Sequence, residues 1–361
     1  MKRLWLILLA VVMIMSCFVG CKGKNGTDTS ETSDQSSTSN STTEAPKSGN
    51  INLLTGLSGL SDKAVGKRPV AIMVNNIKVS LPQYGIGSAD IIYEIVTEGG
   101  ITRLMAMFGD YTKVPNVCSV RSCRYYFPIF AHGYDAVYFC FGANETLGYP
   151  TLKRIKIDYF DGKTYGTLLF DRDQERRKHY AIEHTGYVKG PNIPKALEKE
   201  NVRTELLSDK NKTAFNFRSE NNIAAPSDTA CTKVNIAFSN QYYSTFKYNA
   251  QKGVYYKWHS GKPHKDSALD KQLNFTNVFI LQTDIHNYKG KAIMEVDWTG
   301  GDGYYVSHGA VTEITWKKPS ESSSITFYEK ATGKELEVNP GKSYMAVAKK
   351  GQTTLSADAA Q

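Results

Sequence analysis

The stretch that organises the chain reads Ala89-Asp-Ile-Ile-Tyr-Glu-Ile-Val-Thr-Glu-Gly-Gly-Ile-Thr-Arg-Leu-Met-Ala-Met-Phe108. Its two apolar runs, 89–96 and 101–108, are rich in β-branched and large apolar residues, which is typical of β-strands. Gly99 and Gly100 lie between the runs and supply the positive φ angles that a tight turn requires. The stretch therefore predicts a β-hairpin.

The residues around this hairpin predict a mixture of strands and helices. Residues 68–76 form a short apolar run between turn signals, which indicates a buried strand, and residues 135–141 form a second such run. Residues 125–132 and 146–155 are expected to be helical. Strands that alternate with helices indicate an α/β domain, which we place at residues 51–215.

The pattern changes in the second half of the chain. Between residues 234 and 349, short strand-like runs follow one another with turn residues between them. We expect a mostly β domain at 231–350, a linker at 216–230 and a flexible tail at 351–361. The predicted fold class is an α/β N-terminal domain followed by a mostly β C-terminal domain.

The N-terminus has the features of a bacterial lipoprotein signal. Lys2 and Arg3 precede an apolar run, so residues 1–20 are predicted to be a signal peptide. Cys21 ends this signal and is followed by polar residues, whereas Cys17 is followed by further apolar residues. We therefore expect acylation (palmitate) at Cys21, and an ordinary secreted protein with a chance cysteine there is the alternative. Residues 21–50 lack aromatic residues and are predicted to be a disordered tether.

Export and charge narrow the classes of partner. The predicted location is the cell membrane, where the lipid anchor holds the protein on the extracytoplasmic face. The 361-residue chain has a formal net charge of +9, which suits anionic wall polymers or lipid headgroups but can serve solubility alone. Nucleic acid is not expected as a partner because the protein is exported.

Four further cysteines, Cys118, Cys123, Cys140 and Cys231, do not have the spacing of a metal site. Their pairing cannot be ranked from the sequence, and most are expected to be small buried residues. Cys118 is a weak candidate for a catalytic thiol because no signature pairs it with a base.

Residues 170–185 concentrate ionisable groups, since ten of these sixteen residues are acidic, basic or histidine. Asp171, Asp173, His179 and His184 are residue types that ligate zinc or manganese, but their spacing matches no known motif. We therefore assign no metal and no cofactor.

The chain contains specific motifs at 68–76, 89–94, 98–103, 120–122 with Arg124, 134–136, 261–264, Asp266, 277–278 and 339–342. In combination they closely resemble those of the YerB-like bacterial lipoproteins, and the resemblance covers nearly everything after the tether. It implies a two-part cell-surface lipoprotein whose biochemical activity is not established. The family's Arg-Asp-x-x-Arg run matches Arg172, Asp173 and Arg176, while its following histidine corresponds to either His179 or His184.

Arginines from three segments are expected to converge on one pocket, because guanidinium groups bind phosphate and carboxylate bidentately. The alternative is a buried ion-pair network that fixes the fold, formed with Asp90, Glu94, Glu98, Asp171 and Asp173. The predicted ligand-binding residues are Arg103, Arg121, Arg124, Arg172, Asp173, Arg176, His179, His184, Glu94 and Glu98.

Three functions remain open. The first is a non-enzymatic lipoprotein that binds an anionic cell-wall polymer or a wall-synthesis protein through this Arg/Asp/His pocket. The second is an envelope hydrolase acting on a phosphodiester or amide, with His184 or His179 as acid/base and Asp173 as its partner, with or without a metal. The third is a structural scaffold for membrane proteins.

Overall fold

The computed structural model describes residues 49–207 and 214–357, which lie in one compact unit that begins at residue 46. The predicted signal peptide, Cys21 and nearly all of the predicted tether lie outside the described residues. Within the described ranges, no helix is both long and apolar enough to cross a bilayer.

A ten-stranded sheet runs through both halves of the chain. Its order is β22-β21-β20-β17-β24-β2-β3-β1-β5-β6. Strands β2 and β24 pair in parallel, with Glu94 opposite Ala346, so backbone hydrogen bonds join the two halves. The strands are β1 (Val70–Asn75), β2 (Ile91–Val96), β3 (Thr102–Phe108), β5 (Val137–Cys140), β6 (Tyr159–Asp161), β17 (Asn277–Thr283), β20 (Gly300–Ser307), β21 (Ala310–Lys317), β22 (Thr326–Glu329) and β24 (Ser343–Lys349).

The predicted hairpin is confirmed. Strands β2 and β3 pair antiparallel, with Tyr93 opposite Met105, and Gly99 and Gly100 both have a φ of 71° in the turn. Every residue of the two strands is buried, because other layers cover both faces of the sheet.

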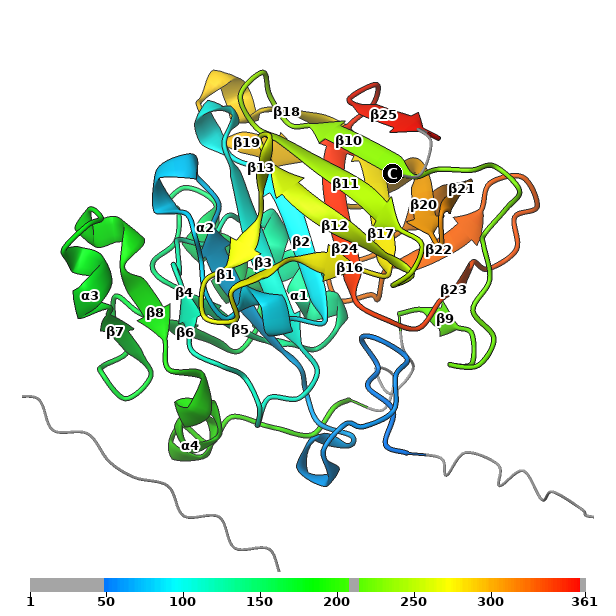
Figure 1. Cartoon of the computed structure of the whole chain (residues 1–361). Coiled ribbons are helices and arrows are strands. Elements are labelled where there is room, and N and C mark those ends of the chain that lie inside the picture. The colour runs from blue at the N-terminus through cyan, green and yellow to red at the C-terminus, as the bar shows by residue number, and fades with distance from the viewer. Residues whose placement is uncertain (1–48, 208–213, 358–361) are drawn as a thin grey trace, which may run out of the picture. The chain divides into compact units, whose positions relative to one another are not determined.

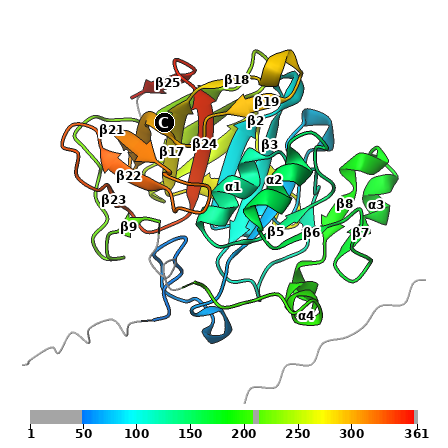
Figure 2. The same ribbon diagram turned by 180° about the vertical axis from the view of Figure 1, so that it is seen from behind.

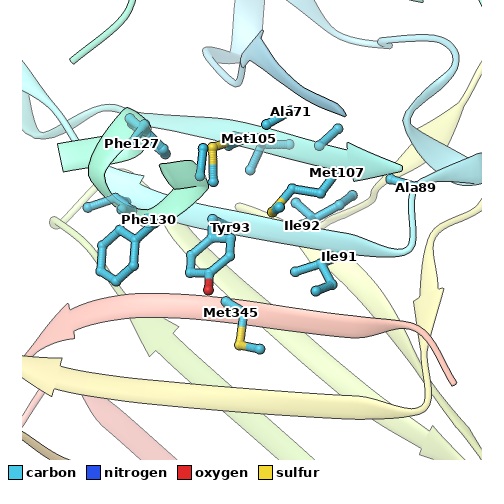
Figure 3. Close-up of a cluster of buried hydrophobic side chains, with 14 of the residues drawn as sticks. Ala71, Ala89, Ile91, Ile92, Tyr93, Met105, Met107, Phe127, Phe130 and Met345 are labelled. Atoms are coloured by element: carbon cyan, nitrogen blue, oxygen red, sulfur yellow. The ribbon is translucent and has the colours of Figure 1, made fainter. Parts of the chain in front are cut away.

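Two helices, α1 (Tyr126–Gly133) and α2 (Gly148–Ile155), cover one face of the sheet, as Figure 2 shows. Figure 3 shows Tyr93, Phe130 and Met345 gathered in the core on this side, with the Tyr93 and Phe130 ring centroids 5.1 Å apart. Each such side chain contributes about 1.5–3 kcal/mol when it is removed from water. The helix side of the sheet is therefore a continuous apolar core.

A six-stranded sheet covers the other face (Figure 1). Phe246 from this sheet packs against Tyr344 of β24, with ring centroids 4.9 Å apart. The unit thus consists of a helical layer, the ten-stranded sheet and the six-stranded sheet. The strands of the smaller sheet are β10 (Lys233–Ala237), β11 (Tyr243–Asn249), β12 (Val254–His259), β13 (Lys262–Pro263), β16 (Asn274–Phe275) and β25 (Thr353–Ser356).

Short elements surround these layers. A three-stranded sheet consists of β4 (Val117–Cys118), β8 (Gly186–Val188) and β7 (Phe170–Arg172), and it lies next to α3 (Gln174–Arg177). Besides short 3-10 turns, the described residues also form α4 (Ile193–Lys199) and the strand pairs β9 (Asn216–Phe217) with β23 (Glu337–Val338), β14 (Lys265–Asp266) with β15 (Lys271–Gln272), and β18 (Ile285–Asn287) with β19 (Met294–Val296).

The predicted fold class agrees with this arrangement, since the N-terminal part is mixed α/β and the C-terminal part consists nearly entirely of strands. Two details differ from the sequence prediction. The segment expected to be a linker contains β9, and Ala224 exchanges hydrogen bonds of 3.1 and 2.7 Å with the side chain of Asn339. Residues 353–356 of the expected flexible tail form β25, which pairs with β10. Both segments are polar but find backbone partners, which composition does not reveal.

Candidate functional site

The candidate site lies at one edge of the ten-stranded sheet. Strands β1, β2, β5, β6, β17 and β24 run in the same direction, so their carboxyl ends meet at this edge. Residues 119–123 pass between the ends of β1 and β5. Arg121 N donates to Met73 O at 3.1 Å, and Phe141 N donates to Arg121 O at 3.0 Å. The backbone of Arg121 is therefore fixed between two strand ends.

This position is a switch point in the sheet. After β1 the chain continues to β2 on one side, and after β5 it continues to β6 on the other. Open α/β sheets commonly bind ligands where neighbouring strands lead in opposite directions in this way. The topology therefore predicts a ligand site at the same edge of the sheet at which the arginine motifs lie.

Arg103 is the most buried member of the group, with 5% of its surface exposed. Its Nη1 donates to Ser122 O, but its Nε has no hydrogen-bond partner among the described residues. Burial, together with the charges of Arg124 and Arg121, lowers the pKa of Arg103 to about 9. A buried guanidinium thus lies near two others of the same charge.

Arg121 is half-buried and also incompletely paired. Its Nη1 lies 3.4 Å from Glu183 O, while its buried Nε has no partner within the described ranges. Burial lowers the pKa of Arg121, Glu183 opposes this shift, and Arg124 and Arg172 add to it. The same arginine therefore lies within electrostatic range of both neighbouring arginines.

The other two arginines have defined partners. Arg124 Nε lies 2.7 and 2.8 Å from the two carboxylate oxygens of Glu98. Arg172 stacks on Phe141, 4.1 Å from the ring centroid, and its Nη1 donates to Ile182 O at 2.6 Å. We refer to Arg103, Arg121, Arg124 and Arg172 as the arginine cluster.

The predicted residues Glu98 and His184 adjoin this cluster. Asn75 Nδ2 lies 3.0 Å from Nδ1 of the buried His184, so this ring nitrogen accepts the amide proton. Burial and the charge of Arg121 lower the pKa of His184, against the opposing effect of Glu183. The surroundings of His184 therefore favour the neutral imidazole.

Four predicted residues do not join the cluster as expected. Arg176 is buried and donates to the carbonyls of Ser80, Pro82 and His184, so it holds loops together. Asp173 caps α3 by accepting from Arg176 N at 3.0 Å, and His179 is exposed beyond that helix. Glu94 pairs with Leu104, and both point toward the six-stranded sheet. Arg103 is the residue before Leu104 and therefore points to the opposite face.

Glu94 instead belongs to a buried polar group between the two sheets, which the sequence analysis did not identify. Its carboxylate accepts hydrogen bonds from Asn76, Thr102, Ser244 and Tyr344, and Lys257 Nζ lies 4.0 Å away. Burial would raise the pKa of Glu94, but Lys257, His259 and these hydroxyl groups bring it below its ordinary value. Burial lowers the pKa of Lys257 to about 8.

A line of hydrogen bonds runs from this buried group to His184, which adjoins the arginine cluster. Lys257 Nζ lies 3.0 Å from His264 Nδ1, and His264 Nε2 lies 2.8 Å from Gln83 Oε1. Gln83 Nε2 donates to Asn75 O at 2.8 Å, and the Asn75 side chain contacts His184. The buried group between the sheets is therefore linked to the histidine that adjoins the arginine cluster.

Neither metal nor thiol chemistry gains support from the geometry. Among the described residues, no group of three or more His, Cys, Asp or Glu side chains is arranged to hold a metal ion. Asp171 pairs with Lys189 at 2.8 Å instead. The four described cysteines are buried and unpaired with one another, and burial raises the pKa of Cys118 and Cys123 to about 12.

Comparisons with known proteins agree with the resemblance noted in the sequence. The chain is 28% identical over 300 residues to the protein described as "Putative lipoprotein YerB" of Bacillus subtilis (strain 168), covering 81% of this chain and 85% of that protein. A crystal structure of the YerB protein from Bacillus subtilis has a TM-score of 0.72 and 26% identity, covering 85% of this chain and 99% of that one.

Two models of one family match most of the described chain. The N-terminal domain of the protein of unknown function DUF3048 matches residues 54–203, and its C-terminal domain matches residues 234–345. Both matches fall on the two parts that the sequence distinguished. The chain therefore belongs to the DUF3048 family, whose two domains here share one sheet.

Proposed function

We propose that this protein is a membrane-anchored lipoprotein of the bacterial envelope that binds an anionic group through the arginine cluster. Its relative YerB carries the description "Putative lipoprotein", which supports membrane anchoring. The anionic ligand is inferred from the cluster itself.

The observation that carries the proposal is the unpaired Nε of Arg103. Burying a polar donor without a partner costs about 1–3 kcal/mol, and more for a charged group. The neighbouring charges of Arg124 and Arg121 add to this cost. A bound anion would supply the missing acceptor and neutralise the surplus charge, so the binding of an anion explains why such an arrangement is kept.

The partners of the acidic residues favour a binding site over a structural ion-pair network. Of the five carboxylates considered for such a network, Glu98 alone pairs with a cluster arginine. Asp171 pairs with Lys189, Asp173 caps α3, and Glu94 lies on the other face of the sheet. Asp90 accepts from Gly109 N at 2.7 Å. The cluster consequently carries more positive than negative charge.

Guanidinium groups select planar or tetrahedral oxyanions, which they bind through pairs of parallel hydrogen bonds. The ligand class is therefore a phosphate or carboxylate group of an envelope component. The hydrolase alternative is less well supported, because Asp173 caps a helix instead of orienting His184.

The first experiment measures anion binding by residues 46–361, with pyrophosphate and citrate as probes in titration calorimetry. Hydrogen bonds to charged groups are worth about 1.5–3 kcal/mol, so Arg121→Ala should weaken binding by at least about tenfold. Arg154→Ala, which removes an exposed arginine of α2, is the matched control and should bind normally. Equal affinities for all three proteins would contradict the proposal.

A second variant distinguishes an anion-binding role of Arg103 from a structural role. Arg103→Met keeps a long apolar side chain but removes the buried charge and the unpaired donor. We expect it to bind anions more weakly and to raise the melting temperature of the ligand-free protein. A structural ion-pair role for Arg103 requires the opposite result, a lowered melting temperature with unchanged anion affinity.

The anchor is tested separately. Cys21, which lies outside the described residues, is the proposed acylation site. The Cys21→Ala variant should lose acylation and leave the membrane fraction, whereas Cys17→Ala should keep both. Membrane retention of acylated Cys21→Ala would exclude this assignment.

A further inference from the structure

The outer face of the six-stranded sheet has an unusual composition. Burial alternates along its strands, and Val234, Phe246 and Lys257 point inward. The outward positions carry lysines, aromatic residues and uncharged polar residues. We call this surface the basic sheet face, and its outward residues on β10 to β12 include Asn235, Tyr243, Thr245, Lys247, Tyr256 and Trp258.

Among the described residues of strands β10 to β12 and the loops that join them, no carboxylate lies on this face. From residue 229 to residue 265 the sequence contains six lysines and no aspartate or glutamate, and Lys257 is the buried one of the six. Lys247, Lys252 and Lys262 are exposed on or beside the face. An ordinary solvated sheet face mixes charges of both signs, so a run of one sign indicates an anionic partner.

Aromatic residues lie between these lysines. Lys247 Nζ lies 5.1 Å from the Trp258 ring centroid, and Lys252 Nζ lies 3.0 Å from Tyr256 Oη. Trp258 and Tyr256 are partly exposed, and the side chains of Lys247 and Lys252 lie over their rings. Such side chains combine an apolar body with a polar or charged end, which is the combination found where proteins meet the surface of a bilayer.

The face is also accessible. Figure 1 looks onto the six-stranded sheet, and no described helix lies over its outer side. From Cys21 to Gly49 the chain spans 28 residues, which reach at most about 95 Å when fully extended. If a lipid attached to Cys21 is inserted in a bilayer, any face of the compact unit can thus reach that bilayer.

We propose that the basic sheet face docks on an anionic bilayer surface, with the lysines at the lipid phosphates and Trp258 at the headgroup level. This docking is independent of the arginine cluster, and it uses the proposed lipid anchor only to keep the bilayer near. Helices α1 and α2, on the opposite side of the layered unit, then face away from the membrane.

Vesicle co-sedimentation of residues 46–361 tests this proposal. The protein should bind vesicles of phosphatidylcholine and phosphatidylglycerol, bind pure phosphatidylcholine weakly, and be released at high salt. Each lysine near an anionic surface contributes about fivefold, so the triple variant Lys247→Gln, Lys252→Gln, Lys262→Gln should lose about a hundredfold in affinity.

Control variants of equal net charge show whether vesicle binding depends on the basic sheet face. The triple variant Lys153→Gln, Lys195→Gln, Lys334→Gln changes the net charge equally at exposed positions elsewhere and should bind nearly as well as the wild type. If both triple variants lose affinity equally, net charge rather than this face drives binding, and the proposal fails. Arg121→Ala should bind vesicles normally, so failure of the arginine site and failure of the sheet face give different results.

Tryptophan fluorescence locates the contact. Binding should shift the emission to shorter wavelength, and Trp258→Phe should abolish this shift while leaving most of the affinity. Trp298→Phe, which removes a tryptophan outside the face, should keep the shift. A protein that ignores anionic vesicles, or that binds a soluble polyanion while ignoring them, would show that this face has another partner.

Discussion

Acidification should destabilise the protein through His259. This histidine lies between the two sheets with 2% of its surface exposed, and neither ring nitrogen forms a hydrogen bond of ordinary geometry with a described residue. Burial and the charge of Lys257 lower its pKa from 6.5 to about 4, with Glu94 opposing and Lys78 adding to the shift. The folded protein therefore holds the neutral imidazole.

The size of the effect follows from linkage between proton binding and unfolding. Because the pKa of His259 is lower in the folded state, the unfolded state binds the proton more readily, and stability falls as the pH drops below about 6.5. The loss is complete below the folded-state pKa of about 4. One pKa unit corresponds to about 1.4 kcal/mol, so this residue removes about 3 kcal/mol in total and about 2 kcal/mol of it by pH 5.

Urea unfolding of residues 46–361 near neutral pH and near pH 5 measures this loss. Since His264 and Glu94 also titrate, the informative quantity is the difference between the wild type and His259→Phe. The variant should lose about 2 kcal/mol less on acidification, and His259→Gln gives a second variant if phenylalanine packs poorly. His286→Phe changes an exposed histidine of β18 and is the control. A wild-type pH dependence in both His259 variants would refute the argument.

Three further outcomes are expected. Lys257→Met should destabilise the protein by about 3–5 kcal/mol in urea unfolding, because it leaves the Glu94 carboxylate buried without its cation, and adding Glu94→Leu should restore part of that loss. Gly190→Ala should cost at least about 1–3 kcal/mol, since its Cβ would lie 2.0 Å from Pro115 O, whereas Gly166→Ala has open space and should be tolerated. In the folded protein, Ellman's reagent should react slowly with the buried thiols, and urea should expose all of them: Cys118, Cys123, Cys140 and Cys231.

The local structure was predictable because it depends on neighbouring residues. The hairpin at Gly99 and Gly100 follows from turn chemistry, and most of the short strands of the second half occur where their apolar runs predict them. The pairing of β2 with β24 was not predictable, because nothing in either strand specifies a partner some 250 residues away. Composition distinguishes a mixed half from a β half, but it does not show that they share a sheet.

The candidate site was predictable in part. Arg103, Arg121, Arg124 and Arg172 do come together, as their motifs suggested. The separation of Glu94 from Arg103 could have been derived from the hairpin, because paired strands place alternate residues on opposite faces. The same alternation puts Lys257 at an inward position of β12, between Tyr255 and His259. Partners such as Phe141 and Glu183 come from distant loops and carry no local signal.

The parallel pairing of β2 with β24 has a consequence for biogenesis. A chain synthesised from its N-terminus presents β2 about 250 residues before β24. Until then β2 presents an unpaired edge, which is a template for pairing with another chain. Truncations before residue 343 should therefore yield aggregating material rather than a working first domain.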